Sequence, residues 1–200
     1  MKLNKLMFRE YDIRGIWNED ITEEISYYIG RAYATKLLSL KKNKMIVGYD
    51  NRLSSPIIEK NLVKGLTDGG VDVVRLGLVT TPMYYYAWDK LNIHCGIMIT
   101  ASHNPKEYNG FKMSYNGIHN CFGNEVAELY YIILNGIYSK GNGSITDANI
   151  KEDYIKMINS HINMGSNKLK VIYDCGNGTT SIVAKDIFVS NDNIEYIPLF

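Results

Sequence analysis

The stretch MIVGYDNRLSSPIIEKNLVKGLTDGGVDVVRL, residues 45–76, predicts a strand, a helix and a second strand in direct succession. Residues 45–49 and 71–76 are short apolar runs, which are typical of buried strands. Ser55 and Pro56 mark the start of the helix, because proline loses no hydrogen bond at the first helical position. The helix then carries apolar residues at helical spacing, namely Ile58, Leu62 and Leu66.

The same alternation of elements continues on both sides of this unit. A helix is predicted to begin at Thr22, where a polar side chain can cap it and two glutamates follow at its positive end. Residues 82–91 predict another helix, and residues 94–100 predict another strand. Strands that alternate with helices favour a mainly parallel sheet. We therefore expect an α/β fold in which a mixed, mainly parallel sheet is covered by helices.

After Ala101 the alternation is interrupted by a polar loop, and residues 111–114 then predict a short strand. Residues 139–144, SKGNGS, are the most linker-like stretch of the chain. We therefore assign residues 1–140 to a first domain. Its last helix is predicted from apolar residues on one face: Phe122, Val126, Leu129, Ile133 and Ile137.

A second domain of similar α/β class is predicted over residues 147–200. A single strand–helix–strand unit cannot cover both faces of its own sheet, so we expect this stretch to be only the start of that domain. Its predicted elements are a helix over about 147–164, a strand over 169–173, a turn over 174–178, a helix over 179–189 and a strand over 194–198.

The composition argues against several classes of protein. Lys and Arg total 22 against 21 Asp and Glu, and a net charge of +1 is not that of a nucleic-acid-binding protein. No apolar run approaches the ~20 residues of a membrane-spanning helix, and the first nine residues lack the apolar core of a signal peptide. The three cysteines show neither a disulfide framework nor metal-ligand spacing, which favours a reduced, cytoplasmic setting: Cys95, Cys121 and Cys175.

The loop TASHNP, residues 100–105, is the best candidate for a reactive site. It follows an apolar strand, where open α/β sheets place their ligands. Small residues at 101 and 102 allow backbone amides to approach a phosphate, and the Ser102 hydroxyl can carry a phosphoryl group. The residues alone also fit an ordinary turn. A serine hydrolase is a weaker alternative, because the sequence has no G-x-S-x-G elbow.

Five ordered segments between residues 8 and 178 resemble the α-D-phosphohexomutase family, and within it the phosphomannomutase/phosphoglucomutase branch. The chain is similar to the amino-terminal portion of that family. The segments are FREYDIRG at 8–15, GYDNR at 48–52 with Ser54 and Ser55, Gly77 with Thr80, Thr81 and Pro82, TASHNPKEYNGFK at 100–112, and DCGNG at 174–178.

The resemblance implies a mutase that interconverts hexose 1-phosphate and hexose 6-phosphate, with mannose, glucose or both as the sugar. Ser102 would be a phosphoserine that donates its phosphoryl group to form a 1,6-bisphosphate and then receives the other phosphate. A phosphoserine carries about −1.5 to −2 charges, so a Mg²⁺ ion is expected to bind the phosphate at Ser102. Glucose or mannose 1,6-bisphosphate would serve as activator and intermediate.

Four more residues match functional positions of the family. Arg14 matches an arginine that helps to bind the phosphoserine, and a guanidinium suits that task because it donates two parallel hydrogen bonds. Lys112 matches a lysine that assists proton transfer at the reacting hydroxyl and contacts the substrate. His103 matches a histidine beside the phosphoserine with a substrate contact or a charge-stabilising role. Tyr11 matches a position near the substrate entry.

The resemblance leaves alternatives open. Phosphoglucosamine mutase is the nearest one, although FREYDIRG and YNGFK favour the phosphomannomutase/phosphoglucomutase branch. A non-catalytic phosphosugar-binding relative is another. The preferred sugar and the oligomeric state are not predicted. The family's metal loop, D-G-D-G-D-R, is absent from these 200 residues, so the remaining Mg²⁺ ligands would lie outside them and the chain alone is expected to be inactive.

Overall fold

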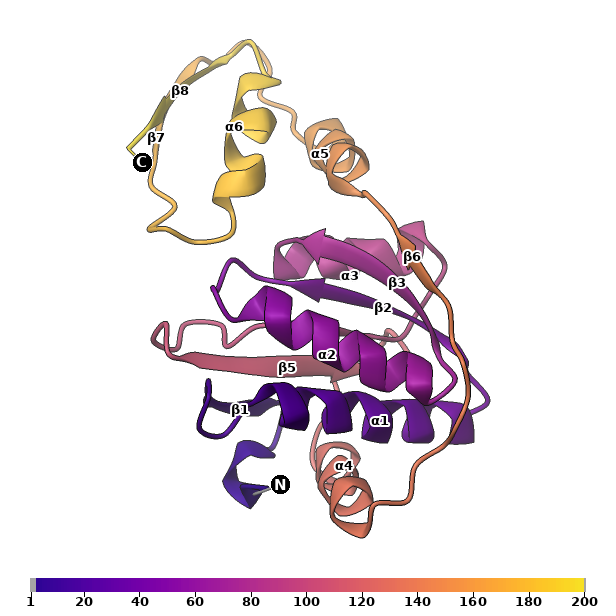
Figure 1. Cartoon of the computed structure of the whole chain (residues 1–200). Helices are drawn as coiled ribbons and strands as arrows, with labels where there is room; N and C mark the ends of the chain where they lie inside the picture. The colour runs from indigo at the N-terminus through magenta and orange to yellow at the C-terminus, as the bar shows by residue number, and fades with distance from the viewer. Residues whose placement is uncertain (1–2, 200) are drawn as a thin grey trace.

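The computed structural model describes residues 3–199, which form a six-stranded sheet and a separate two-stranded sheet (Figure 1). The large sheet has the strand order β1-β5-β4-β2-β3-β6. Its strands are β1 (Ile13–Ile16), β2 (Lys44–Tyr49), β3 (Asp72–Leu78), β4 (Gly96–Ile99), β5 (Tyr108–Ser114) and β6 (Ile145–Asp147), and the small sheet pairs β7 (Leu169–Tyr173) with β8 (Ile194–Pro198).

Most neighbouring strands of the large sheet run parallel. β4, β2, β3 and β6 are parallel neighbours, whereas β5 is antiparallel to both β4 and β1. The expectation of a mixed, mainly parallel sheet is therefore confirmed. The helices are α1 (Glu23–Ser39), α2 (Ser55–Asp68), α3 (Thr81–Lys90), α4 (Asn124–Asn135), α5 (Lys151–Ser160) and α6 (Ser181–Val189), with a short 3₁₀ turn η1 (Lys5–Met7) at the start.

The sheet separates two hydrophobic cores, because successive side chains of a strand point to opposite faces. α1, α2 and α4 cover one face, where Val47, Ile97 and Phe111 are fully buried. α3 covers the other face, where Ile46 and Met98 are fully buried. α5 packs against α3, and α6 packs against α5, so that these helices connect the small sheet to the large one. Along the part of the chain that is described, no helix is long and apolar enough to cross a membrane.

α1 and α2 approach each other so closely that only glycine fits at their crossing. A Cβ atom on Gly30 would lie 2.3 Å from the carbonyl oxygen of Leu62, and one on Gly65 would lie 2.1 Å from that of Tyr27. These distances are far below van der Waals contact. The two glycines therefore fix how α2 lies on the sheet, and with it the polar loop 50–54 that precedes the helix.

Two predicted features of the first 140 residues differ from the structure. Phe122 and Ile137 do not lie on the buried face of α4, since the first is 51% exposed and the second 76% exposed. Both residues fall outside the helix, which is bounded by Gly123 and Gly136 with positive φ angles of 54° and 65°. The middle three of the five apolar positions are buried as expected.

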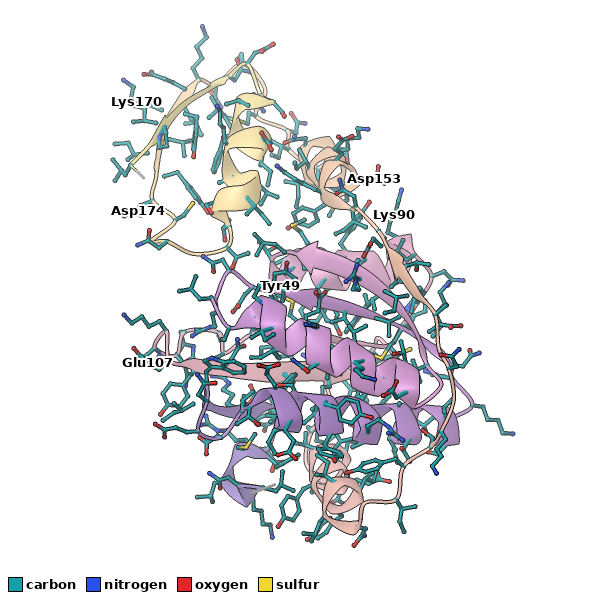
Figure 2. The ribbon with its side chains drawn as sticks, in the orientation of Figure 1. Tyr49, Lys90, Glu107, Asp153, Lys170 and Asp174 are labelled. Carbon is teal, nitrogen blue, oxygen red and sulfur yellow. The ribbon has the colours of Figure 1, made fainter. Side chains whose placement is uncertain are left out.

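The second half of the chain begins with a strand that the sequence did not predict. Residues 145–147 form β6, which lies parallel to β3, and the following helix α5 is shorter than the predicted 147–164. α5 is tied to the first unit by an ion pair of 2.9 Å between Lys90 and Asp153 (Figure 2). The small sheet with α6 has few buried side chains, among them Val183 and Ala184.

Candidate active site

A cleft of about 740 Å³ lies at the carboxyl ends of β2, β3 and β4, the edge where parallel sheets place their ligands. One wall is formed by the loops that follow these strands, and the opposite wall by the turn that precedes α6. Ser102 and His103 both line the cleft. The lining residues are 50–53, 79–82, 98, 100, 102–104, 106 and 176–180.

Ser102 lies exposed in the loop between β4 and β5. Its φ angle is 57°, a left-handed conformation that residues other than glycine rarely adopt. Its backbone N–H donates a hydrogen bond of 2.9 Å to Oγ1 of Thr100, which helps to hold this conformation. The chain thus presents the hydroxyl to the cleft from a backbone that is constrained rather than free.

His103 is adjacent to this hydroxyl, with Nδ1 3.3 Å from Oγ of Ser102. A serine hydrolase would need a third group to orient the histidine. Within residues 3–199 no hydrogen bond or ion pair joins a carboxylate to His103. The pair therefore lacks the arrangement that activates a serine nucleophile, and the hydrolase alternative loses support.

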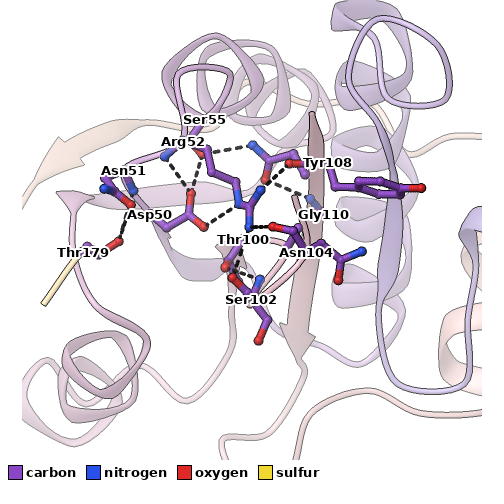
Figure 3. A network of polar contacts seen from close by, with 12 residues as sticks. Asp50, Asn51, Arg52, Ser55, Thr100, Ser102, Asn104, Tyr108, Gly110 and Thr179 are labelled. Carbon is purple, nitrogen blue, oxygen red and sulfur yellow. Dashed lines mark hydrogen bonds and ion pairs between the residues drawn. The ribbon is translucent and has the colours of Figure 1, made fainter. Parts of the chain in front are cut away.

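Arg52 is the centre of the polar network beside this loop (Figure 3). Its guanidinium is mostly buried, with a side-chain exposure of 11%, and Nε lies 3.2 Å from Oδ2 of Asp50. The remaining N–H groups donate to four carbonyl oxygens of the loop. Nη1 donates to those of Pro105 at 2.6 Å and Tyr108 at 2.9 Å. Nη2 donates to those of Ser102 at 3.1 Å and Asn104 at 2.7 Å.

A second set of hydrogen bonds holds Asp50 in place beneath Arg52. Oδ1 of Asp50 accepts from Oγ of Ser55 at 2.8 Å and from the backbone N–H of Arg52 at 3.1 Å. Asn109 is completely buried, and its Nδ2 donates to Oγ of Ser54 at 2.8 Å and of Ser55 at 3.0 Å. Buried polar networks of this kind are rigid when their members are satisfied.

Arg14 holds the loop from the opposite side. It lies on β1, and its side chain is only 13% exposed. Nε and Nη2 both donate to Oδ2 of Asp12 at 2.8 Å, while Nη1 donates to Oδ1 of Asn104 at 2.7 Å and to the Ala101 carbonyl at 3.3 Å. This arginine is a partly buried strand residue in contact with the TASHNP loop.

Lys112 and Tyr11 are not part of the hydrogen-bond networks described above. Lys112 is on β5, where it pairs with Met98, and Arg14 pairs with Gly110 two residues earlier. The register therefore places Lys112 and Arg14 on the same face of the sheet, as diagonal neighbours. Tyr11 lies just before β1 and is 68% exposed. Neither Tyr11 nor Lys112 is among the residues that line the cleft.

Asn51 joins the two walls of the cleft. Its Nδ2 donates to the carbonyl of Asn177 at 2.7 Å, and its Oδ1 accepts from Oγ1 of Thr179 at 2.8 Å. Its backbone N–H donates to the same Oγ1 at 3.2 Å. Asp174, which the sequence analysis assigned to a turn, accepts from the N–H of Gly176 at 2.7 Å, as a turn residue does.

Sequence reasoning did not select Arg52, Asp50 or Asn109 as site residues. All three lie in segments that were quoted for the family resemblance, GYDNR and YNGFK. The available signal was an aspartate and an arginine two residues apart, directly after an apolar strand. Only the folded chain shows which carbonyl groups the arginine reaches.

The described residues do not form a Mg²⁺ site by themselves. Across residues 3–199 there is no group of three His, Cys, Asp or Glu side chains arranged to hold a metal ion. The carboxylate of Asp50, which lines the cleft, already accepts hydrogen bonds from Arg52 and Ser55. Mg²⁺ prefers six oxygen ligands in octahedral geometry, and the residues present do not supply them.

Comparison with known proteins gives a consistent result. Residues 5–136 match the family described as "Phosphoglucomutase/phosphomannomutase, alpha/beta/alpha domain I". The chain is 40% identical to a phosphomannomutase/phosphoglucomutase of Pseudomonas syringae over 195 residues, which are 97% of this chain and 41% of that protein. It is 38% identical to a phosphoglucomutase of Neisseria meningitidis over 184 residues, 91% of this chain and 40% of that one.

A solved structure shares the fold as well. The crystal structure of a phosphoglucomutase/phosphomannomutase family protein from Burkholderia thailandensis superposes with a TM-score of 0.92 at 31% identity. The superposition covers 100% of this chain and 44% of that one. The chain thus spans about two fifths of the length of the curated relatives that it matches.

Proposed function

The chain belongs to the phosphoglucomutase/phosphomannomutase family, and on this premise we propose that it supplies the phosphoryl-carrying part of a hexose phosphate mutase. The observation that carries the proposal is the placement of Ser102. Its hydroxyl is exposed at a cleft, on a loop that is held by arginines on two sides. A site that transfers a phosphoryl group needs a carrier that is held in a fixed position.

The proposed reaction exchanges phosphoryl groups between Ser102 and the sugar. A sugar hydroxyl attacks the phosphorus of phosphoserine, the bond to Oγ breaks, and a hexose 1,6-bisphosphate forms. The bisphosphate then reorients in the site. Oγ attacks the phosphorus of the other phosphate, and the isomeric monophosphate is released. In each transfer the attacking hydroxyl loses a proton and the leaving oxygen gains one. Lys112 is proposed to assist this proton transfer, and Arg14 and His103 to stabilise the charge on the phosphate.

We further propose that a Mg²⁺ ion shares the charge of the phosphate at Ser102, with its other ligands from outside the described residues. Glucose or mannose 1,6-bisphosphate is the proposed activator, and Tyr11 is a proposed contact at the substrate entry. A cytoplasmic location fits this chemistry and is part of the proposal. The choice between mannose and glucose is not predicted.

The test is the covalent state of Ser102. A full-length protein that carries these 200 residues is incubated with Mg²⁺ and glucose 1,6-bisphosphate, and its intact mass and phosphopeptides are measured. We expect one phosphoryl group, mapped to Ser102. In Ser102→Ala both this phosphoryl group and the turnover of glucose 1-phosphate and mannose 1-phosphate should be lost. Ser190→Ala, which changes an exposed serine outside the cleft, is the control and should behave as wild type.

Three other results would contradict the proposed function. A protein that binds hexose phosphates but takes no phosphoryl group would be the non-catalytic relative. Turnover of glucosamine 1-phosphate in preference to both other sugars would identify a phosphoglucosamine mutase. Wild-type turnover by Ser102→Ala would show that Ser102 is not the phosphoryl carrier.

A further inference from the structure

Arg52 has no part in the reaction as proposed so far, yet it makes more contacts with the Ser102 loop than Arg14 does. Of the loop residues 102–108, four direct their backbone carbonyl oxygen at its guanidinium. These residues are 50 to 56 positions away from Arg52 in the chain. We propose that Arg52 is a positioning residue that turns the carbonyl groups of this loop away from the Ser102 phosphoryl group, and this inference rests on the proposed function.

The first step of the argument is the geometry of the peptide unit. In a planar trans peptide the C=O and N–H groups point in opposite directions, and no cis peptide bond occurs among the described residues. A carbonyl directed at Arg52 therefore turns the N–H of the next residue away from it. Because the carbonyls of Ser102 and Pro105 are directed at Arg52, the N–H groups of His103 and Lys106 point away from it.

The second step is the state of those two N–H groups. Between residues 3 and 199, neither the N–H of His103 nor that of Lys106 donates a hydrogen bond to a protein acceptor. Both residues line the cleft beside Ser102. Backbone N–H groups without a protein partner are the donors that bind phosphate in loops and at helix starts. Arg52 thus leaves donors, rather than acceptors, on the side of the loop that is turned away from it.

The third step is electrostatic. A phosphoserine carries about −1.5 to −2 charges, and carbonyl oxygens that faced it would repel it. Arg52 collects four of these oxygens around one positive charge that is 11% exposed. The carboxylate of Asp50 orients the guanidinium through Nε and is itself held by Ser55. The charge of Arg52 is therefore balanced by Asp50 and the four carbonyl oxygens. Arg52 acts on the phosphoryl group only indirectly, through the orientation of the loop backbone.

The test compares Arg52→Lys and Arg52→Ala with the control Arg75→Lys. Lysine keeps the charge but has one nitrogen, so it cannot reach four carbonyls in a planar fork. Arg75 also binds an aspartate through two nitrogens, to Asp147 at 2.8 and 3.1 Å, but it is outside the cleft. Hydrogen exchange is measured in the 200-residue chain. Kinetics are measured in a full-length protein that carries it.

We expect faster exchange in both Arg52 variants at the hydrogen-bonded amides of this segment, those of Ser102, Asn104 and Tyr108, and unchanged exchange in the control. In Arg52→Lys, kcat should fall roughly 10- to 100-fold, as misplacement of a reacting group does, and phosphoryl transfer to Ser102 should slow equally. KM should stay within about twofold of the wild-type value, because the substitution disturbs the position of Ser102 and leaves the contacts with the sugar in place. Added methylguanidine should restore part of the kcat of Arg52→Ala and none of that of Ser102→Ala.

The outcomes separate this inference from the proposed function. If wild-type Ser102 takes no phosphoryl group, the proposed function fails, and the inference fails with it. If wild type takes it and Arg52→Lys takes it as fast, only the inference is overturned. Loss of the cooperative thermal transition in Arg52→Lys would also overturn it, because Arg52 would then be needed for the fold rather than for the position of Ser102.

Discussion

The left-handed backbone of Ser102 stores strain at the residue that is proposed to react. A side chain in this conformation costs roughly 1–2 kcal/mol, and the cost persists because neighbouring groups fix the loop. Here these groups are Thr100, Arg14 and Arg52. Strain of this kind is found where a protein holds a reactive group in one orientation.

The strain predicts opposite effects of substitution on stability and activity. Ser102→Gly should raise the free energy of unfolding by about 0.5–1 kcal/mol, because relief of strain exceeds the added freedom of glycine in the unfolded chain. Ser102→Ala keeps the strain and should leave stability nearly unchanged. Both should lack the phosphoryl group. Urea unfolding of the three proteins measures the difference, and a Ser102→Gly protein less stable than Ser102→Ala would contradict the strain argument.

Arg14 should contribute to stability as well as to the site. Its removal leaves the carboxylate of Asp12, whose side chain is 9% exposed, without its main partner. Arg14→Ala should therefore lower the free energy of unfolding by about 1–3 kcal/mol. Arg14→Lys should lose less, since it keeps a positive charge beside Asp12. Thermal and urea unfolding test this, and an unchanged melting temperature in Arg14→Ala would show that Asp12 finds another partner or water.

From the sequence, candidate site residues could be predicted where they are neighbours in the chain. Residues that come together only in the folded protein were missed. Ser102 and His103 are neighbours in one loop, so a single segment revealed both. Arg52 reaches its carbonyl partners across 50 to 56 positions, and their identity depends on how α2 lies on the sheet. The roles of Ser102, His103, Arg14, Lys112 and Tyr11 stay predictions.

Among the elements, long amphipathic helices and buried strands were predicted within a few residues. β8, for instance, covers the predicted residues 194–198. The two missed strands, β1 and β6, are short and lie at the edges of the sheet. β1 is the sequence IRGI, with a charge and a glycine, and all three residues of β6 are exposed. Such strands form because a neighbour offers hydrogen bonds, and not because of their own composition.

α2 carries an acidic side chain that makes stability depend on pH. Burial raises the pKa of Glu59 from its ordinary value of 4.5 to about 7, although the charge of Arg75 opposes the shift. Its Oε1 has no hydrogen-bond partner within the described part of the chain. The folded state therefore holds a proton that the unfolded state releases between pH 4.5 and 7. This contribution to stability is present below pH 4.5 and is lost as the pH rises through 7.

Glu59→Gln removes this dependence. Relative to wild type, its free energy of unfolding should increase by about 1–3 kcal/mol between pH 4 and pH 8. Urea unfolding at the two pH values measures the change, with Glu19→Gln as the control, because Glu19 is exposed. A difference between Glu59→Gln and wild type that stays constant with pH would show that Glu59 titrates normally.

For the molecule as a whole, the proposed site lies between two unequal parts. The large sheet has complete layers on both faces, whereas the two-stranded sheet with α6 has few buried side chains. Two-stranded sheets are marginal on their own. The division into domains at residues 140 and 147 stays a prediction, and Asn51 is one of the links between the two parts across the cleft.

We expect the 200-residue chain to fold but to show no mutase turnover. The described residues offer no carboxylate cluster for Mg²⁺, so the charge of the phosphoryl group would stay uncompensated. Assays with mannose 1-phosphate and glucose 1-phosphate, in the presence of Mg²⁺ and glucose 1,6-bisphosphate, test this against a full-length relative. Turnover within about tenfold of that relative would show that the 200 residues hold a complete site.

The antiparallel pairing of β1 with β5 also has a consequence for synthesis on the ribosome. Arg14 meets Ala101 and Asn104, which follow it by 87 and 90 residues. At the usual speed of translation, about 5–20 residues per second, β1 has no partner for roughly 5–20 s after it leaves the exit tunnel. α1, α2 and the parallel strands β2, β3 and β4 precede β5 in the chain and can already fold in that interval. The Ser102 loop is therefore completed late, and a nascent chain stalled before β5 would expose the apolar side of β1 to chaperones.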